Sequence, residues 1–201
     1  LTLRTSEGSG GSGIQIERDG DKLASMQEIA FPRGTTVEVR DLFFNLPARR
    51  KFLRSDPSEL GQIVKYVTHV GLAYPQIRLS LSHGRRDLLN CPPVGSLRER
   101  IFQLYGKSLL EKLLEIDFTG SAGRISGFAS LPPHGRPDKS HQLFFINLRP
   151  VRDRILQSAL NQAYKGFLEK DLSPEAFLFL TLPYGDVDVN VHPAKSEVRF
   201  R

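Results

Sequence analysis

The stretch "HQLFFINLRPVRDRILQSAL" (residues 141–160) decides how the second half of the chain folds. It begins with an apolar run typical of a strand and continues into apolar positions at helical spacing. Another apolar run, "AFLFLTLP", follows at 176–183. We therefore expect a strand, a helix over 154–170 and a further strand. The residues expected to face inward from this helix are Leu156, Leu160, Ala163 and Phe167.

The chain before this stretch predicts further strands and a break between domains. Strands are expected at "LLEIDF" (113–118) and "GRISGFASL" (123–131), after short helical segments at 96–114. The segment "CPPVGS" (91–96) interrupts the pattern, as Pro and Gly commonly do. We place the domain boundary there, which gives domains at 1–93 and 94–201.

The first half alternates apolar and polar residues in several short runs. Strands are expected at 1–7, 13–20 and 35–44, and a helix at 55–72 carries an apolar stripe. A hairpin follows at 76–91. His69 lies beside the stripe, and we interpret it as a polar residue at a helix margin because no nucleophile or metal ligand is apparent nearby.

Residues 8–13, "GSGGSG", spell the G-x-G-x-x-G spacing of a phosphate-binding loop. That mechanism needs a helix after the glycines, so that a phosphate meets backbone amides at its N-terminus. Here a strand follows instead. The run is therefore a flexible hairpin connection or an engineered junction.

The composition is that of an ordinary globular protein. The chain has 201 residues, of which 39% are hydrophobic and 25% charged, and its 28 basic and 22 acidic residues give a net charge of +6. This charge is compatible with a polyanionic partner but does not require one. The single Cys91 excludes an internal disulfide and a Cys-rich metal site. No apolar run approaches the length of a membrane span.

Three segments together resemble one family. They are "GTTVEVRDLFFNLPARRKFL" (34–53), "NLRPVRDRILQSAL" (147–160) and "DVNVHPAKSEVRF" (188–200), and they stand in the family's order. In these segments the chain resembles the DNA mismatch-repair protein MutL and its relatives. The resemblance extends over nearly the whole chain.

The resemblance implies an α+β fold. Residues 1–93 would be the C-terminal part of an ATPase domain of the gyrase, chaperone, histidine-kinase and MutL type. Residues 94–201 would be an α/β transducer domain with a left-handed β-α-β crossover and a DNA-binding groove, a departure from the usual handedness. The glutamate base, magnesium-binding asparagine and glycine-rich lid of such ATPases would precede this chain.

The resemblance also implies two contacts to ATP. Thr35 matches a threonine that helps to bind adenine, and Lys195 matches a lysine that reaches from the transducer to the terminal phosphate. A cation opposite the breaking bond stabilises developing charge, so Lys195 is the candidate catalytic residue. Without the resemblance, Thr35 would be an ordinary strand residue and Lys195 a solvated turn residue.

The DNA-binding candidates lie in the third quarter of the chain. Arg154 matches an arginine on the basic groove of the family's transducer, with Arg149 and Arg152 just before it. Lys165 would lie three helical turns beyond Arg154 on the same helix face. A row of charges on a helix is otherwise a solvated face.

For the complete protein, the resemblance implies ATP and Mg²⁺ as cofactors, with neither expected to bind this chain tightly and with no metal-ligating residue assigned in it. The implied partners are double- or single-stranded DNA, the mismatch-recognition protein MutS, other repair enzymes and a second copy or paralogue, with no membrane. The place would be the cytoplasm, at the nucleoid, in a bacterium and the nucleus in a eukaryote. This chain alone should neither hydrolyse ATP nor dimerise with nucleotide. The alternative is a non-catalytic nucleic-acid-binding module that shares the transducer fold. An E-x-x-x-N helix and a D-x-G-x-G loop in the roughly 100 residues upstream would favour the ATPase.

Overall fold

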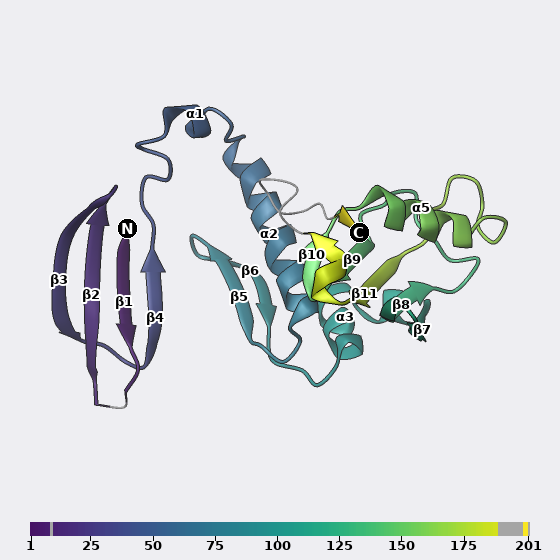
Figure 1. The fold of residues 1–201 in the computed structure, drawn as a ribbon, viewed down its shortest axis with the longest axis horizontal. Helices are drawn as coiled ribbons and strands as arrows, with labels where there is room; N and C mark the ends of the chain where they lie inside the picture. Colours follow the sequence, from purple (N-terminus) through teal and green to yellow (C-terminus); the bar gives the residue numbers. More distant parts are fainter. Residues whose placement is uncertain (9, 189–198, 201) are drawn as a thin grey trace. The chain divides into compact units, whose positions relative to one another are not determined.

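The computed structural model describes residues 1–8, 10–188 and 199–200. The described chain forms two compact units, Leu1–Glu59 and Leu60–Arg201 (Figure 1). This division follows the packing of the chain and lies earlier than the boundary at residue 93 that the sequence predicts for the family's two domains. That predicted boundary stays a prediction.

The first unit is a four-stranded antiparallel sheet in the order β3-β2-β1-β4. Its elements are β1 (Thr2–Ser6), β2 (Ser12–Asp19), β3 (Lys22–Ala30), β4 (Gly34–Glu38) and the short helix α1 (Pro47–Arg50). β1 pairs with β2 from Thr2↔Glu17 to Thr5↔Ile14, so the glycine-rich segment joins two neighbouring antiparallel strands. The expected hairpin is confirmed.

The strand expected over 35–44 is shorter in the structure. β4 ends at Glu38, and both Asp41 and Phe43 adopt left-handed backbone conformations, with φ of 50° and 66°. Alternating apolar letters continue beyond Glu38, but a left-handed residue turns the chain out of an extended strand. The prediction was wrong for 39–44 for this reason.

The second unit contains a five-stranded mixed sheet in the order β10-β9-β11-β8-β7. Its strands are β7 (Leu113–Gly120), β8 (Gly123–Ser130), β9 (Gln142–Ile146), β10 (Arg149–Val151) and β11 (Ala176–Thr181). β11 is parallel to β9 and antiparallel to β8. Parallel neighbours need a crossover, and helix α5 (Arg154–Ala163) provides it.

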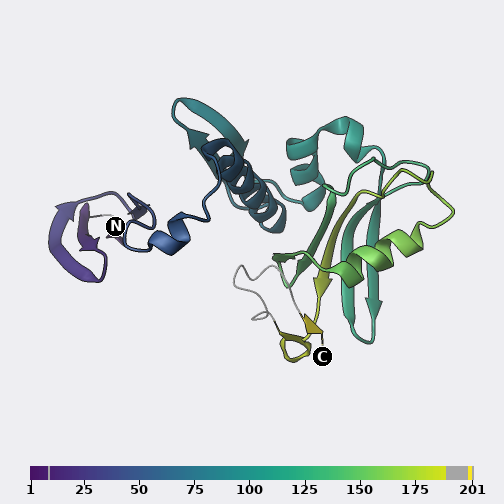
Figure 2. The same cartoon turned by 90° about the horizontal axis from the view of Figure 1, so that it is seen from above.

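Helices cover both faces of this sheet, as Figure 2 shows from above. Successive β9 residues point to opposite faces, so Leu143 and Phe145 enter one core cluster while Phe144 and Ile146 enter the other. The first cluster also takes in residues from the ends of α2 (Asp56–Ala73) and α3 (Leu97–Tyr105). The second includes Leu160 of α5. The apolar run therefore forms an interior strand, β9, that is buried on both faces.

The remaining elements of the second unit are the short helix α4 (Lys107–Leu110) and a hairpin of β5 (Leu79–His83) and β6 (Arg86–Cys91). A 3₁₀ turn at Tyr184–Asp186 precedes the two-residue strands β12 (Val187–Asp188) and β13 (Arg199–Phe200). The expected helix at 55–72 and the expected hairpin at 76–91 are both present.

Helix α5 is shorter than its sequence pattern predicts. It ends at Ala163, and Gly166 follows with φ of 89°. A glycine in the left-handed region takes the chain out of helical geometry. The helix therefore ends although the apolar pattern of the sequence continues to residue 170. As a result Phe167 is exposed rather than inward, and Ala163 at the end of the helix is exposed as well, which corrects the sequence-based expectation for both residues.

The architecture is α+β, as predicted. The hand of the β9-α5-β11 crossover stays a prediction. Within the described part of the chain, no helix is long and apolar enough to cross a membrane.

Candidate nucleic-acid interface

A groove of about 930 Å³ lies within the second unit, between α2 and the sheet edge formed by β9 and β10. One wall is a single face of α2, and β10 with the residues after it forms the opposite side. The segment before β9 contributes Asp138, Lys139 and Ser140 to the lining. The charged and aromatic residues that line it are Lys65, Tyr66, His69, Asp138, Lys139, Phe144, Phe145, Arg149 and Arg152.

The α2 wall consists of residues at helical spacing. Gln62, Lys65, Tyr66 and His69 stand at positions i, i+3, i+4 and i+7, which lie on one helix face. The helix is anchored by its last turn, where Leu72 and Ala73 are buried in the core. The core contact thus fixes which face of α2 borders the groove.

The opposite wall begins at a tight turn between β9 and β10. Asn147 and Leu148 have φ of 47° and 67°, which suits a two-residue hairpin turn. The Asn147 amide donates to Leu182 O at 3.0 Å, and Leu182 N donates to Asn147 Oδ1 at 3.0 Å. These bonds fasten the turn to the chain after β11. They thereby set the position of Arg149, the first residue of β10.

The groove has a positive electrostatic character. Burial lowers the pKa of Lys65, and the nearby charge of Arg152 lowers it further. Burial also lowers the pKa of His69 to about 4, and the charges of Lys65 and Arg152 add to this effect. His69 is therefore neutral at pH 7, and the charge of the α2 wall resides on Lys65.

None of Lys65, Arg149 and Arg152 forms an ion pair with a side chain in the part of the molecule that the structure describes. Asp138 is the acidic residue that lines the groove, and its Oδ2 pairs with Arg136 Nη2 at 2.9 Å. Hydrogen bonds from Ser140 and the charge of Arg136 hold the pKa of Asp138 down, at about 2. Like charges held close together without partners are a feature of anion-binding sites.

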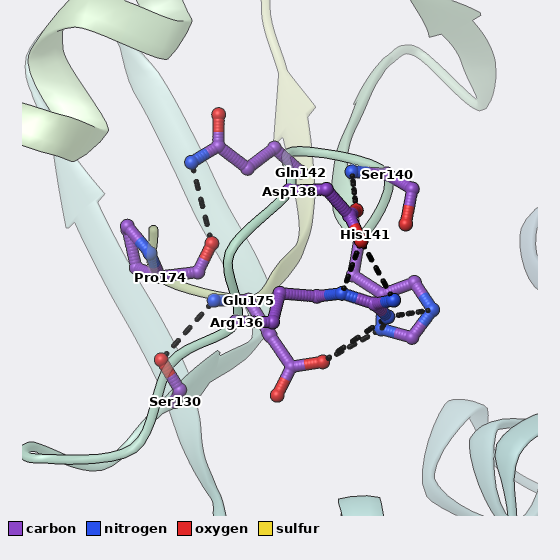
Figure 3. Close-up of polar contacts among 8 residues, drawn as sticks. All are labelled: Ser130, Arg136, Asp138, Ser140, His141, Gln142, Pro174 and Glu175. Atoms are coloured by element: carbon purple, nitrogen blue, oxygen red, sulfur yellow. Dashed lines mark hydrogen bonds and ion pairs between the residues drawn. The ribbon is translucent and has the colours of Figure 1, made fainter. Parts of the chain in front are cut away.

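A polar network holds the loop before β9, whose residues line the groove (Figure 3). His141 Nδ1 lies 2.7 Å from Glu175 Oε1, and Arg136 Nη1 lies 2.8 Å from His141 Nε2. Donation from Nδ1 to the carboxylate leaves Nε2 free to accept from the guanidinium. Asp138 Oδ1 accepts from Ser140 N at 2.7 Å. These contacts order the loop and hold Asp138, Lys139 and Ser140 in the lining of the groove.

The same network continues into the protein interior. Glu175 N donates to the buried Ser130 Oγ at 3.2 Å, and Gln142 Nε2 donates to Pro174 O at 3.3 Å (Figure 3). Glu175 and Gln142 are both buried. The Ser130 hydroxyl is buried and engaged in this contact, and the role of the network is to position the loop.

The structure brings together two of the four DNA-binding residues expected from the sequence. Arg149 and Arg152 line the groove. Arg154 is the exposed first residue of α5 and does not line it. Lys165 is exposed beyond the end of α5, so it does not share a helix face with Arg154 as expected. The early end of the helix is the physical reason.

Of the two ATP-binding candidates, the described residues include only Thr35. Thr35 is exposed on β4, opposite Thr5 of β1, and its Oγ1 lies 2.8 Å from Thr5 Oγ1. A second hollow of about 570 Å³ in the first unit is lined by residues such as Arg40 and Phe44, and Thr35 is not among them. Lys195 lies outside the described residues. The roles of Thr35 and Lys195 stay predictions.

No metal site is evident in the described residues, where no group of three or more His, Cys, Asp or Glu side chains could hold an ion.

Sequence reasoning missed Lys65 and Tyr66 and gave His69 only a marginal role. Their shared spacing on α2 was available as a signal. What the sequence lacked was the identity of the element that faces them, because β9 and β10 lie far along the chain from α2.

Comparisons with known proteins agree with this architecture. A family profile described as "DNA mismatch repair protein, C-terminal domain" matches residues 101–201. This match places the chain among the DNA mismatch-repair proteins. MutL of Koribacter versatilis is 37% identical over 229 residues and MutL of Brucella anthropi is 42% identical over 205, in both cases across 100% of this chain. The chain belongs to the MutL family.

The chain spans about a third of the length of these relatives, 35% and 33% respectively. Among solved structures, the N-terminal domain of a DNA repair protein matches with a TM-score of 0.82 and 25% identity, covering 99% of this chain and 65% of that one. The Aquifex aeolicus MutL ATPase domain complexed with ADP matches with a TM-score of 0.69 and 27% identity, covering 90% and 67%. Myxococcus xanthus gyrase B, at 13% identity and a TM-score of 0.50, shares the fold alone.

Proposed function

We propose that this chain is the part of a mismatch-repair ATPase that binds DNA and couples nucleotide state to the repair machinery. The observation that carries the proposal is the groove in which Arg149, Arg152 and Lys65 gather without carboxylate partners among the described side chains. Cationic grooves of this kind neutralise backbone phosphates. Membership of the MutL family supports DNA as the polyanion.

Binding through this groove would be independent of DNA sequence. Arginine and lysine contacts to phosphate fix position on DNA but do not read bases. Arg154 and Lys165 would extend the contact surface beyond the groove, since both are exposed cations of the same unit. The affinity should therefore depend strongly on salt and little on sequence.

ATP belongs to the complete protein in this proposal. The related Aquifex aeolicus MutL ATPase domain was solved as a complex with ADP, which supports a nucleotide site in the fold. Thr35 would contact adenine, and Lys195 would contact the terminal phosphate from the transducer side. Mg²⁺ ligands and the general base would come from elsewhere in the complete protein, so this chain alone should be inactive.

ATP binding and hydrolysis would drive closure of a dimer with a second copy or a paralogue, which then engages DNA, MutS and other repair enzymes. Such work would take place in the cytoplasm at the nucleoid of a bacterium, or in the nucleus of a eukaryote. The alternative of a non-catalytic nucleic-acid-binding module receives less support, because the MutL relatives match all of the chain and not the transducer region alone.

The test is fluorescence anisotropy of labelled DNA at several salt concentrations. The groove variant Arg149→Ser/Arg152→Ser removes two cations from the lining. The control Arg78→Ser/Arg98→Ser removes two exposed arginines of the same unit that do not line the groove. Each lost phosphate contact should flatten the slope of log affinity against log salt by about 0.7 to 0.9.

We expect the groove variant to weaken binding to every sequence about equally, with a slope that is flatter by about 1.4 to 1.8 for two contacts. The control variant should keep the slope of the wild type. Equal effects of the two variants, or no effect of either, would remove the groove as the DNA site.

A further inference from the structure

We propose that two residues of α2 contact single-stranded DNA in this groove: Tyr66 stacks on an unpaired base, and Lys65 binds the backbone phosphate beside it. The proposal rests on the proposed DNA-binding function of the groove. It goes further by assigning new contact residues on α2 and by naming the form of DNA that the α2 wall recognises.

The exposure of Tyr66 is the first observation. Its side chain is 64% exposed although it lines the groove and lies on the same helix face as the half-buried Lys65 and His69. An aromatic ring left open beside cations has no role in the core of this unit. Such a ring offers a flat surface on which a base can stack.

The arrangement of charge around Tyr66 is the second observation. Lys65 is its neighbour in the chain, and the charge of Arg152 on the opposite wall is close enough to lower the pKa of Lys65. A phosphate between the two walls would neutralise both cations. Lys139 and Arg149 add two further cations to the lining, and Asp138 is already paired with Arg136.

Tyr66 and the cations have different selectivities. Lysine and arginine bind phosphates of duplex and single strand alike, since both carry the same backbone charge. The faces of paired bases are covered by their stacked neighbours in a duplex, so a tyrosine ring at the surface cannot stack on them. An unpaired base presents its face, and stacking tolerates any base because each has a π-face. Tyr66 would therefore raise the affinity for single-stranded DNA but not for duplex DNA.

An acidic peptide would satisfy the cations equally well but would gain nothing from the ring. For this reason the aromatic residue, and not the charge, identifies the occupant. The combination of a basic groove and an open aromatic surface is the arrangement found in proteins that bind single strands without sequence preference.

The experiment measures affinity for a labelled oligothymidine strand of about 12 nucleotides and for a mixed-sequence duplex of the same length, a size within the range that single-strand sites cover. The variants are Tyr66→Ser, which removes the ring, Tyr66→Phe, which keeps it, and Lys65→Gln. Tyr184→Ser and Lys107→Gln are the matched controls, because Tyr184 is 87% exposed and neither residue lines the groove. Arg152→Ser reports on the groove itself.

Tyr66→Ser should weaken single-strand binding by about 5- to 150-fold, the range measured for loss of one stacked base, and should change duplex binding by less than about twofold. Tyr66→Phe should bind the single strand within about twofold of the wild type, because the ring and not the hydroxyl stacks. Lys65→Gln should weaken both substrates and flatten the single-strand salt slope by about 0.7. The two controls should behave as the wild type.

The outcomes separate this inference from the function on which it rests. If Arg152→Ser weakens binding while Tyr66→Ser leaves it unchanged, or weakens single strand and duplex equally, the groove binds DNA but Tyr66 does not stack. Loss of single-strand binding in Tyr66→Phe as well as Tyr66→Ser would also overturn stacking. If neither Arg152→Ser nor Tyr66→Ser has an effect, the proposed function of the groove fails together with this inference. Melting temperatures of all variants identify any loss that comes from unfolding.

Discussion

The imidazole of His69 meets the ring of Phe145 edge-on, with ring centroids 6.2 Å apart and ring planes at 78°. Phe145 is fully buried on strand β9, so His69 rests on the core while its other side borders the cationic groove. This contact explains why the pKa of His69 is low: burial disfavours the charged ring, and the cations Lys65 and Arg152 disfavour it further.

The low pKa of His69 predicts a loss of stability in mild acid. In the unfolded chain His69 titrates near 6.5, whereas in the folded protein it titrates at about 4. Between these values the unfolded state binds more protons, so the free energy of unfolding falls as the pH falls from 6.5 toward 4, by on the order of 2 kcal/mol. Chemical denaturation across this range should show the loss, and His69→Gln should reduce it. A pH dependence that is the same in both proteins would contradict the assignment.

Lys195 can be tested in a complete ATPase that contains this chain. If it contacts the transferred phosphate, Lys195→Ala removes a charge-assisted contact that strengthens in the transition state, and kcat should fall by about tenfold to a thousandfold. Lys195→Arg keeps the charge but changes reach and shape, so partial activity is expected. The sequence predicts a turn at this position, where a lysine contributes little to stability. An unchanged kcat in a Lys195→Ala protein with a normal melting temperature would leave Lys195 without a role in catalysis.

Arg154→Glu separates the two parts of the expected DNA surface. The substitution reverses a charge on the exposed first residue of α5, so DNA binding should weaken for all sequences and the salt slope should flatten by about 1. A negative side chain suits the N-terminus of a helix, so stability should hold or rise by about 0.3 to 1 kcal/mol. A loss of DNA binding would then not result from unfolding. Normal binding by Arg154→Glu would confine the DNA surface to the groove.

Asp153 caps the helix that begins at Arg154. Its Oδ1 accepts hydrogen bonds from Ile155 N at 2.8 Å and Leu156 N at 3.0 Å. Asp153→Ala leaves both donors without this partner and should cost about 0.5 to 2 kcal/mol of stability. Asp153→Asn keeps a capping oxygen and should lose only about a few tenths of a kcal/mol of stability. Equal melting temperatures for Asp153→Ala and the wild type would show that the cap does not stabilise α5.

Gly127 of β8 lies against the backbone of β11, with φ of 129°. A Cβ atom there would lie 2.0 Å from Phe177 O. Gly127→Ala must therefore distort the two central strands and should destabilise the second unit by more than about 3 kcal/mol. Gly61→Ala is the matched control, because Gly61 has open space around it in α2 and alanine favours a helix by about 0.5 to 1 kcal/mol. Similar melting temperatures for the two variants would contradict this packing.

The sequence was reliable where a local pattern coincides with burial. The apolar run of 142–146 predicts a strand, and β9 lies at the centre of the second unit with every residue buried. The sequence was unreliable where the backbone conformation ends a helix or strand before the apolar pattern of its residues ends. Asp41 and Phe43 end β4 early, and Gly166 follows the early end of α5. The left-handed conformations of Asp41 and Phe43 leave no trace in the apolar pattern, whereas Gly166 is a helix stop signal that the continuing apolar pattern obscures.

By itself, the sequence determined the family and the type of most elements, because motifs and periodicity are properties of consecutive residues. Through the family resemblance it named Arg149 and Arg152 among four DNA-binding candidates, without separating them from Arg154 and Lys165. Tertiary structure decided that Arg149 and Arg152 face Lys65, Tyr66 and His69 across one groove. It also decided that His69 is neutral at pH 7, since its pKa depends on burial against Phe145 and on charges from a distant strand. Such effects arise from long-range packing: α2 and β10 are brought together by the core that both of them help to bury.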